Sequence, residues 1–129
     1  MNNELTPYEQ ALDLKKLGFN EECLAFYNST SKTPNELLYP QYGGEVGNWN
    51  VENHLISTPL YQQAFRWFRE KYNIVHEIVR KEDKNHREFI AWVYAENDKI
   101  EVVSYWYALS YEESKLACLK KLIEIVKNK

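Results

Sequence analysis

Several residue types and patterns are scarce in this chain of 129 residues, and each scarcity argues against a class of protein. Two cysteines, Cys23 and Cys118, are too few for the disulfide framework of a small secreted domain, which favours two separate buried thiols over a disulfide. The net charge of −3 leaves no excess of lysine and arginine for a face that binds duplex nucleic acid. No apolar run approaches the roughly 18 residues of a membrane span, and the N-terminus lacks the pattern of a signal peptide. We therefore expect a cytoplasmic protein that does not bind membranes, and nucleic acid is a disfavoured partner.

Recognisable catalytic and metal-binding motifs are also missing. The three histidines, His54, His76 and His86, have no established ligand spacing, although His76 and His86 could meet across a turn. The glycine cluster at 43–47 has no strand before it and no helix start directly after it, so it does not form a phosphate-binding loop. No serine, cysteine or aspartate stands on a nucleophile elbow. We predict no metal, no cofactor and no catalytic residues.

Aromatic residues are plentiful instead, at 15% of the chain, and the remaining composition is that of a globular protein. The length suits one domain over residues 1–129, with a long irregular loop at 28–57.

Capping signals, breakers and apolar periodicity predict the remaining elements. They are a helix over 7–17, a short strand over 23–27, a helix over 59–72, strands over 74–80, 87–96 and 99–107, and a helix over 111–126.

Both of the first two helices are predicted to begin at a Thr-Pro pair. Thr6 and Thr58 are expected to cap the helix with their hydroxyls, while the proline that follows takes the first helical position. Ser110 and Glu113 predict a third capping box before the last helix. The predicted fold is therefore α+β: an antiparallel sheet of three to four strands with helices packed on one face, in the order helix, loop, helix, three strands, helix.

The predicted hairpin over 89–107 has two chemically different faces. A two-residue turn at Asn97-Asp98 would place Val93 opposite Val102 on a small aliphatic face, which suits the core. The reverse face then carries four large rings, those of Trp92, Tyr94, Tyr105 and Tyr107. These rings are the candidate partner-binding residues, and either a homodimer or the chain's own segment 23–42 could cover them.

These patterns favour a non-catalytic accessory or protein-interaction protein, with a protein partner or a second copy on the aromatic sheet face. Two alternatives remain open. The first is a small hydrolase-like enzyme with a site near the loop at 43–54, which would need converging polar groups there. The second is a single-stranded nucleic-acid binder, which would need cations beside the exposed rings.

The segments Tyr8-Glu9-Gln10-Ala11, Thr58 to Tyr72 and Tyr111 to Val126 are similar to those of a group of short uncharacterised proteins. These proteins occur in phages, prophages and mobile elements of gut Bacteroidetes. The resemblance spans most of the chain apart from the 28–57 loop, and it consists of capping and core patterns. It therefore implies a fold and a phage-related origin, but it implies no activity and no site residues.

Overall fold

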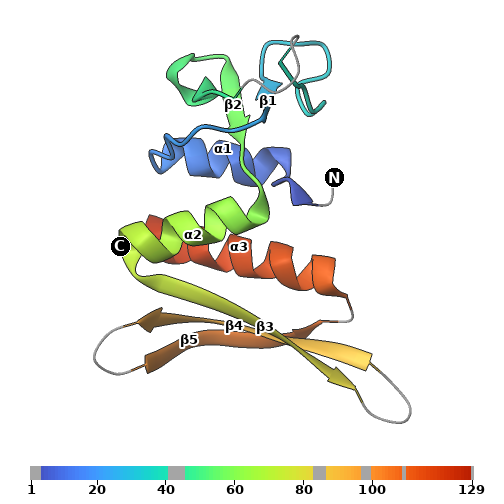
Figure 1. Ribbon diagram of the computed structural model, residues 1–129, viewed down its shortest axis with the longest axis vertical. Helices are drawn as coiled ribbons and strands as arrows, with labels where there is room; N and C mark the ends of the chain where they lie inside the picture. Colours follow the sequence, from blue (N-terminus) through green and yellow to red (C-terminus); the bar gives the residue numbers. More distant parts are fainter. Residues whose placement is uncertain (1–3, 41–45, 83–86, 97–99, 109, 129) are drawn as a thin grey trace. The chain divides into compact units, whose positions relative to one another are not determined.

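The computed structural model describes residues 4–40, 46–82, 87–96, 100–108 and 110–128. It is an α+β structure with antiparallel sheets of two and three strands (Figure 1). The chain divides into two compact units, residues 1–63 and 64–129, which are described separately below. The prediction of a single domain over 1–129 stays a prediction. Among the described residues, none of the helices combines the length and the apolar character that a membrane span needs.

The first unit contains helix α1 (Tyr8–Lys16), strand β1 (Ala25–Asn28), the short 3-10 helix η2 (Trp49–Val51) and strand β2 (Leu55–Thr58). The short strand predicted at 23–27 is present, shifted by one or two residues. Its partner β2 lies inside the predicted loop and pairs with it in antiparallel register, from Ala25 opposite Thr58 to Asn28 opposite Leu55. A buried cluster of Ala11, Tyr27 and Ile56 joins α1 to this small sheet.

The predicted capping by the two threonines is wrong. Helix α1 has Pro7 as its N-cap residue with no side-chain capping bond, and helix α2 (Tyr61–Tyr72) begins two residues later than predicted. The hydroxyls of Thr6 and Thr58 are buried without a hydrogen-bond partner, while the Thr6 backbone N–H donates to the Pro59 carbonyl at 3.0 Å. The two Thr-Pro segments run side by side as an antiparallel bridge at Leu5 and Leu60, and this backbone pairing leaves the threonines unable to cap.

The described part of the 28–57 loop is held by side-chain hydrogen bonds to backbone. Asn50 donates from Nδ2 to the Phe19 carbonyl at 2.9 Å and accepts at Oδ1 from the Ser57 N–H at 2.8 Å. The Trp49 indole N–H donates to the Cys23 carbonyl at 2.9 Å. Lys15 of α1 donates from Nζ to three carbonyls, those of Glu52, Asn53 and Leu55, at 2.7, 3.2 and 2.6 Å. This segment is therefore ordered by bonds to α1 and to the stretch between α1 and β1.

The second unit contains most of α2, the strands β3 (Ile74–Glu82), β4 (Arg87–Glu96) and β5 (Ile100–Ala108), and helix α3 (Tyr111–Lys127). The three strands form an antiparallel sheet in the order β3-β4-β5, as predicted. Asn73, with a φ of 58°, ends α2 in the left-handed conformation that asparagine tolerates. Ser110 caps α3 as predicted, because its hydroxyl accepts from the Glu113 N–H at 3.0 Å. Within this unit, α2 and α3 lie on the same side of the sheet (Figure 1).

The predicted register between β4 and β5 is wrong. Val93 lies opposite Ser104, and Val102 lies opposite Tyr94, with an irregularity between Val93 and Tyr94. The pairing of Glu96 with Ile100 leaves three residues between the strands where two were expected, and Val103 has no pairing partner. The longer loop and the unpaired Val103 each displace the register by one residue, so most of the hairpin is displaced by two. A displacement of two residues returns each side chain there to the face on which it was predicted. The predicted turn residues Asn97 and Asp98 lie outside the described part of the chain.

The core of the second unit lies between the sheet and its helices. Ala91 and Val93 of β4 are fully buried, as are Cys118, Leu119 and Leu122 of α3. His76 of β3 lies opposite Val93, and its ring stacks on Phe65 of α2 at a centroid distance of 3.6 Å. Burial, with a smaller contribution from the Arg69 charge, lowers the pKa of His76 to about 4.

We expect Asn50→Ala to lower the free energy of unfolding by about 1–3 kcal/mol, because both bonds of the Asn50 amide are lost and their backbone partners are left unpaired. Urea denaturation of the full chain measures this loss. Asn53→Ala is the matched control, since Asn53 is exposed and contributes only its backbone carbonyl. Equal stability of the two variants would contradict the anchoring role.

We expect the protein to lose stability as the pH falls from about 6.5 towards 4. The unfolded chain takes up a proton on His76 near its ordinary pKa of 6.5, whereas the folded chain resists it until about pH 4, so acid favours unfolding. This difference in the pKa of His76 contributes at most about 3 kcal/mol to the free energy of unfolding. Melting temperatures measured across this window should decline less steeply in His76→Gln, while His54→Gln, at an exposed position, should follow the wild type. Parallel curves for all three proteins would refute this assignment.

Candidate functional site

Two of the four predicted partner-binding residues lie on β4 and two on β5. The register places Tyr105 directly opposite Trp92, and Tyr107 opposite Ile90. Trp92 and Tyr94 are half-buried, and Tyr107 is 55% exposed. The side chain of Tyr105 is outside the described part of the structure. The backbone pairing therefore brings the predicted residues onto neighbouring positions of one sheet.

Strand β3 adds to the same side of the sheet. Val75 pairs with Tyr94, Glu77 with Trp92, and Val79 with Ile90. We name the surface formed by Val75, Glu77, Val79, Lys81, Glu88, Ile90, Trp92, Tyr94 and Tyr107 the open face. Both α2 and α3 lie against the opposite side within this unit (Figure 1). The open face therefore carries rings and aliphatic side chains without a helix of its own unit against it.

One row of the open face crosses all three strands and has an exposed side chain at each end. Val79 is 46% exposed at the β3 end of the row, Ile90 lies between, and Tyr107 is 55% exposed at the β5 end. In the neighbouring row, Tyr94 donates a long hydrogen bond of 3.5 Å from its hydroxyl to Glu77. Exposed apolar side chains grouped along one row of a sheet are characteristic of surfaces that bind other proteins.

The groups with strongly shifted pKa values lie away from the open face. Burial, followed by the charge of Glu21, raises the pKa of Cys23 to about 12, and burial raises that of Cys118 to about 12. Both thiols are free and stay protonated at neutral pH, so neither provides an activated nucleophile. His76 is neutral and stacked in the core. These shifts follow from packing and do not converge on a reaction centre.

The proposed hydrolase-like site near the 43–54 loop gains no support from the residues that can be described. Residues 43–45 lie outside that part of the chain. Further along, the polar groups of Trp49 and Asn50 are used in bonds to backbone. Within the described residues, no group of three histidine, cysteine, aspartate or glutamate side chains could hold a metal ion.

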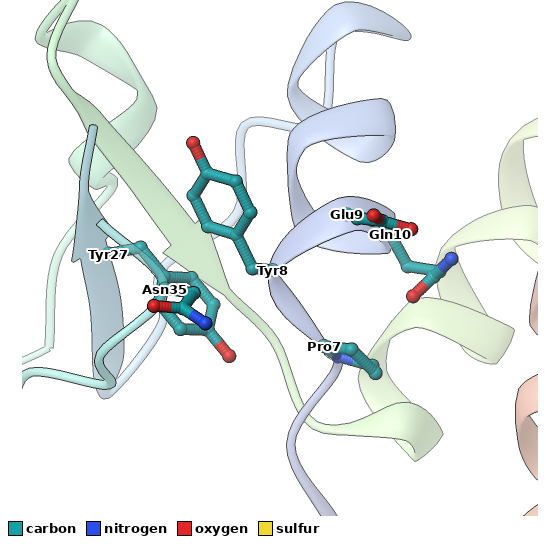
Figure 2. A pocket seen from close by; sticks show the side chains of 6 residues that line it. All are labelled: Pro7, Tyr8, Glu9, Gln10, Tyr27 and Asn35. Carbon is teal, nitrogen blue, oxygen red and sulfur yellow. The ribbon is translucent and has the colours of Figure 1, made fainter. Parts of the chain in front are cut away.

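A cavity of about 420 Å³ lies in the first unit, at the N-terminal end of α1. Six residues line it: Pro7, Tyr8, Glu9, Gln10, Tyr27 and Asn35. Figure 2 shows these side chains arranged around the first turn of α1 and the strand that carries Tyr27. The Tyr8 ring meets the Tyr27 ring edge-on at 5.3 Å, and the Tyr27 hydroxyl donates to the Thr6 carbonyl at 3.2 Å.

The sequence analysis missed this cavity because it treated Thr6-Pro7-Tyr8-Glu9 only as a helix start. The available signal was Gln10, a polar residue directly before Ala11 and one turn before Leu14, the two apolar residues at which the helix packs. Asn35 and Tyr27 could not be associated with it, since the fold of the loop brings them there.

Comparisons of the chain with known protein families, curated proteins and solved structures gave no match.

Proposed function

We propose that the protein is a non-catalytic protein-interaction protein whose open face binds a second copy of the same chain. The observation that carries this proposal is the row Val79, Ile90 and Tyr107, exposed at both ends, on the side of the sheet opposite α2 and α3. A three-stranded sheet normally buries one face and exposes a polar one, whereas this exposed face is largely apolar and aromatic. Tyrosine and tryptophan are the residues enriched at the centres of interfaces.

The charges of β3 favour a second copy as the partner. Every second residue of this strand lies on the open face, in the order Glu77, Val79 and Lys81. The two charged side chains are exposed. A two-fold axis that passes Val79 places Glu77 of each copy opposite Lys81 of the other. Each copy then contributes one Glu77 and one Lys81, so two equivalent charged pairs form across the interface. A symmetric dimer requires such a self-complementary arrangement.

The size of the sheet sets the strength of this association. Strands of nine or ten residues extend for roughly 30 Å, and three of them span roughly 15 Å. Such a footprint is smaller than the roughly 800 Å² per partner of a stable interface. We therefore propose a dimer that dissociates on dilution, as in an accessory protein with a reversible role.

Two broader assignments belong to the same proposal. We propose that this accessory role belongs to a phage or mobile element, on the strength of the sequence resemblance alone. We also propose a cytoplasmic location, for which the free thiols Cys23 and Cys118 provide support.

We expect Tyr107→Lys to shift the dimerisation midpoint to at least tenfold higher concentration, because it places a desolvated charge in the interface. Sedimentation velocity from about 10 μM to 1 mM measures the midpoint. Tyr39→Lys is the matched control, since Tyr39 is also an exposed tyrosine, at 45%, and lies in the first unit, so it should leave the midpoint unchanged.

The charged pair provides a second, independent variant series. Glu77→Lys and Lys81→Glu should each weaken the dimer, because each places like charges opposite one another, and the double variant should restore it. A wild-type protein that remains monomeric at 1 mM would refute the proposal. A dimer that none of the open-face substitutions affects would refute the location of the interface.

A further inference from the structure

Strand β3 is an edge of the three-stranded sheet, and its outer side has no strand beside it within the described part of the chain. The sheet order is β3-β4-β5, and β4 pairs with every residue from Ile74 to Glu82 on the inner side. In an antiparallel ladder, alternate residues of an edge strand point their N–H and carbonyl groups away from the neighbouring strand. No described residue outside β4 forms a backbone hydrogen bond with residues 74–81. Strand β3 therefore presents a row of donors and acceptors that another strand can use.

The helices of the second unit cover only the first half of this edge. On the helix side of β3, Ile74 is buried and His76 stacks on Phe65. Farther along the same side, the side chains of Arg80 and Glu82 are 49% and 55% exposed. A second copy turned end for end would place its covered half beside this uncovered half. The helices that cover the two sheets would then lie at opposite ends of the paired strands and would not overlap.

Symmetry limits how two copies of β3 can pair. A two-fold axis perpendicular to the sheet keeps both open faces on one side, so each residue lies opposite a residue of the same face. The axis must then pass a single residue, which lies opposite its own copy. An axis at Glu77, Arg80 or Lys81 would place like charges against each other. An axis at Ile78 would place Glu77 and Lys81 opposite valine residues, so an axis at Val79 is the favoured one.

We propose that β3 pairs over residues 76–82 with β3 of a second copy, antiparallel and about an axis at Val79, to form one six-stranded sheet. Glu77 of each copy then lies directly opposite Lys81 of the other, and such cross-strand pairs of opposite charge stabilise a sheet. The same exposed charges disfavour pairing with unrelated strands. The contact uses the edge of the sheet and leaves the open face accessible, so it does not depend on the proposed open-face dimer.

The experiment measures the distance across the axis, because charge reversal at Glu77 or Lys81 would weaken a contact at either the edge or the open face. Paired strands bring the Cα atoms of the two Val79 residues to about 5 Å, within the range of a disulfide bond, whereas sheets packed face to face hold them about 10 Å apart. Val79→Cys is therefore oxidised with glutathione disulfide at the highest concentration of the sedimentation series, and linked dimers are followed by non-reducing electrophoresis.

We expect Val79→Cys to form linked dimers at least tenfold faster than Val51→Cys. Val51 is the matched control because it is a valine of the first unit that is 73% exposed, against 46% for Val79, so random collisions favour it. The wild type, in which Cys23 and Cys118 are buried, should form no linked dimer. A rate for Val79→Cys no higher than that of Val51→Cys would overturn the proposal.

The register has its own test. Four residues along the strand separate the two copies of residue 77, which is roughly 14 Å, so Glu77→Cys alone should not cross-link, and the same holds for Lys81→Cys alone. An equal mixture of Glu77→Cys and Lys81→Cys places the thiols opposite each other and should cross-link. Equal rates for the mixture and for either single variant would overturn the register at Val79.

Tyr107→Lys separates the edge from the open face. Tyr107 lies on β5, two strands or roughly 10 Å from the β3 edge, so its substitution in Val79→Cys should leave the cross-linking rate unchanged. A tenfold loss of cross-linking in this double variant would show that the contact requires the open face and would overturn an independent edge. The open-face dimer is judged separately, by the effect of Tyr107→Lys on the sedimentation midpoint.

Discussion

The alternation of side chains along β4 is the constraint on which the second unit depends. Consecutive residues of a strand point to opposite sides, so a core on one side commits the intervening residues to the other. Ala91 and Val93 are fully buried against the helices, and their neighbours Trp92 and Tyr94 must therefore stand on the open face. Burial of the core and presentation of the rings are two results of a single backbone register.

Elements controlled by neighbouring residues could be predicted from the sequence. The Ser110 cap fixes the start of α3, and Gly18, with a φ of 95°, ends α1 while the Phe19 N–H returns to the Leu14 carbonyl. Strand β4 has the predicted bounds for the same reason, since its alternation is visible within ten residues. The sharing of a face by Trp92 and Tyr94 follows from that alternation alone.

Features set by distant parts of the chain could not be predicted. The pairing of β1 with β2 joins segments separated by the whole loop, and neither strand shows more than four residues of pattern. The Thr6 cap failed because Leu5 and Leu60 pair across the unit, which local rules do not consider. The β4–β5 register was predicted wrongly because it depends on both the loop length and the unpaired Val103. The residue composition of the hairpin determines neither of them. The cavity at α1 depends on that same tertiary arrangement.

The three carbonyl bonds of Lys15 have a consequence for how the first unit opens. One ammonium group joins the last turn of α1 to the carbonyls of Glu52, Asn53 and Leu55, and its three donors are all used. Fraying of the helix end would release the loop, and release of the loop would leave the ammonium to be rehydrated. The two segments therefore belong to one cooperative unfolding unit, although nearly forty residues separate them along the chain.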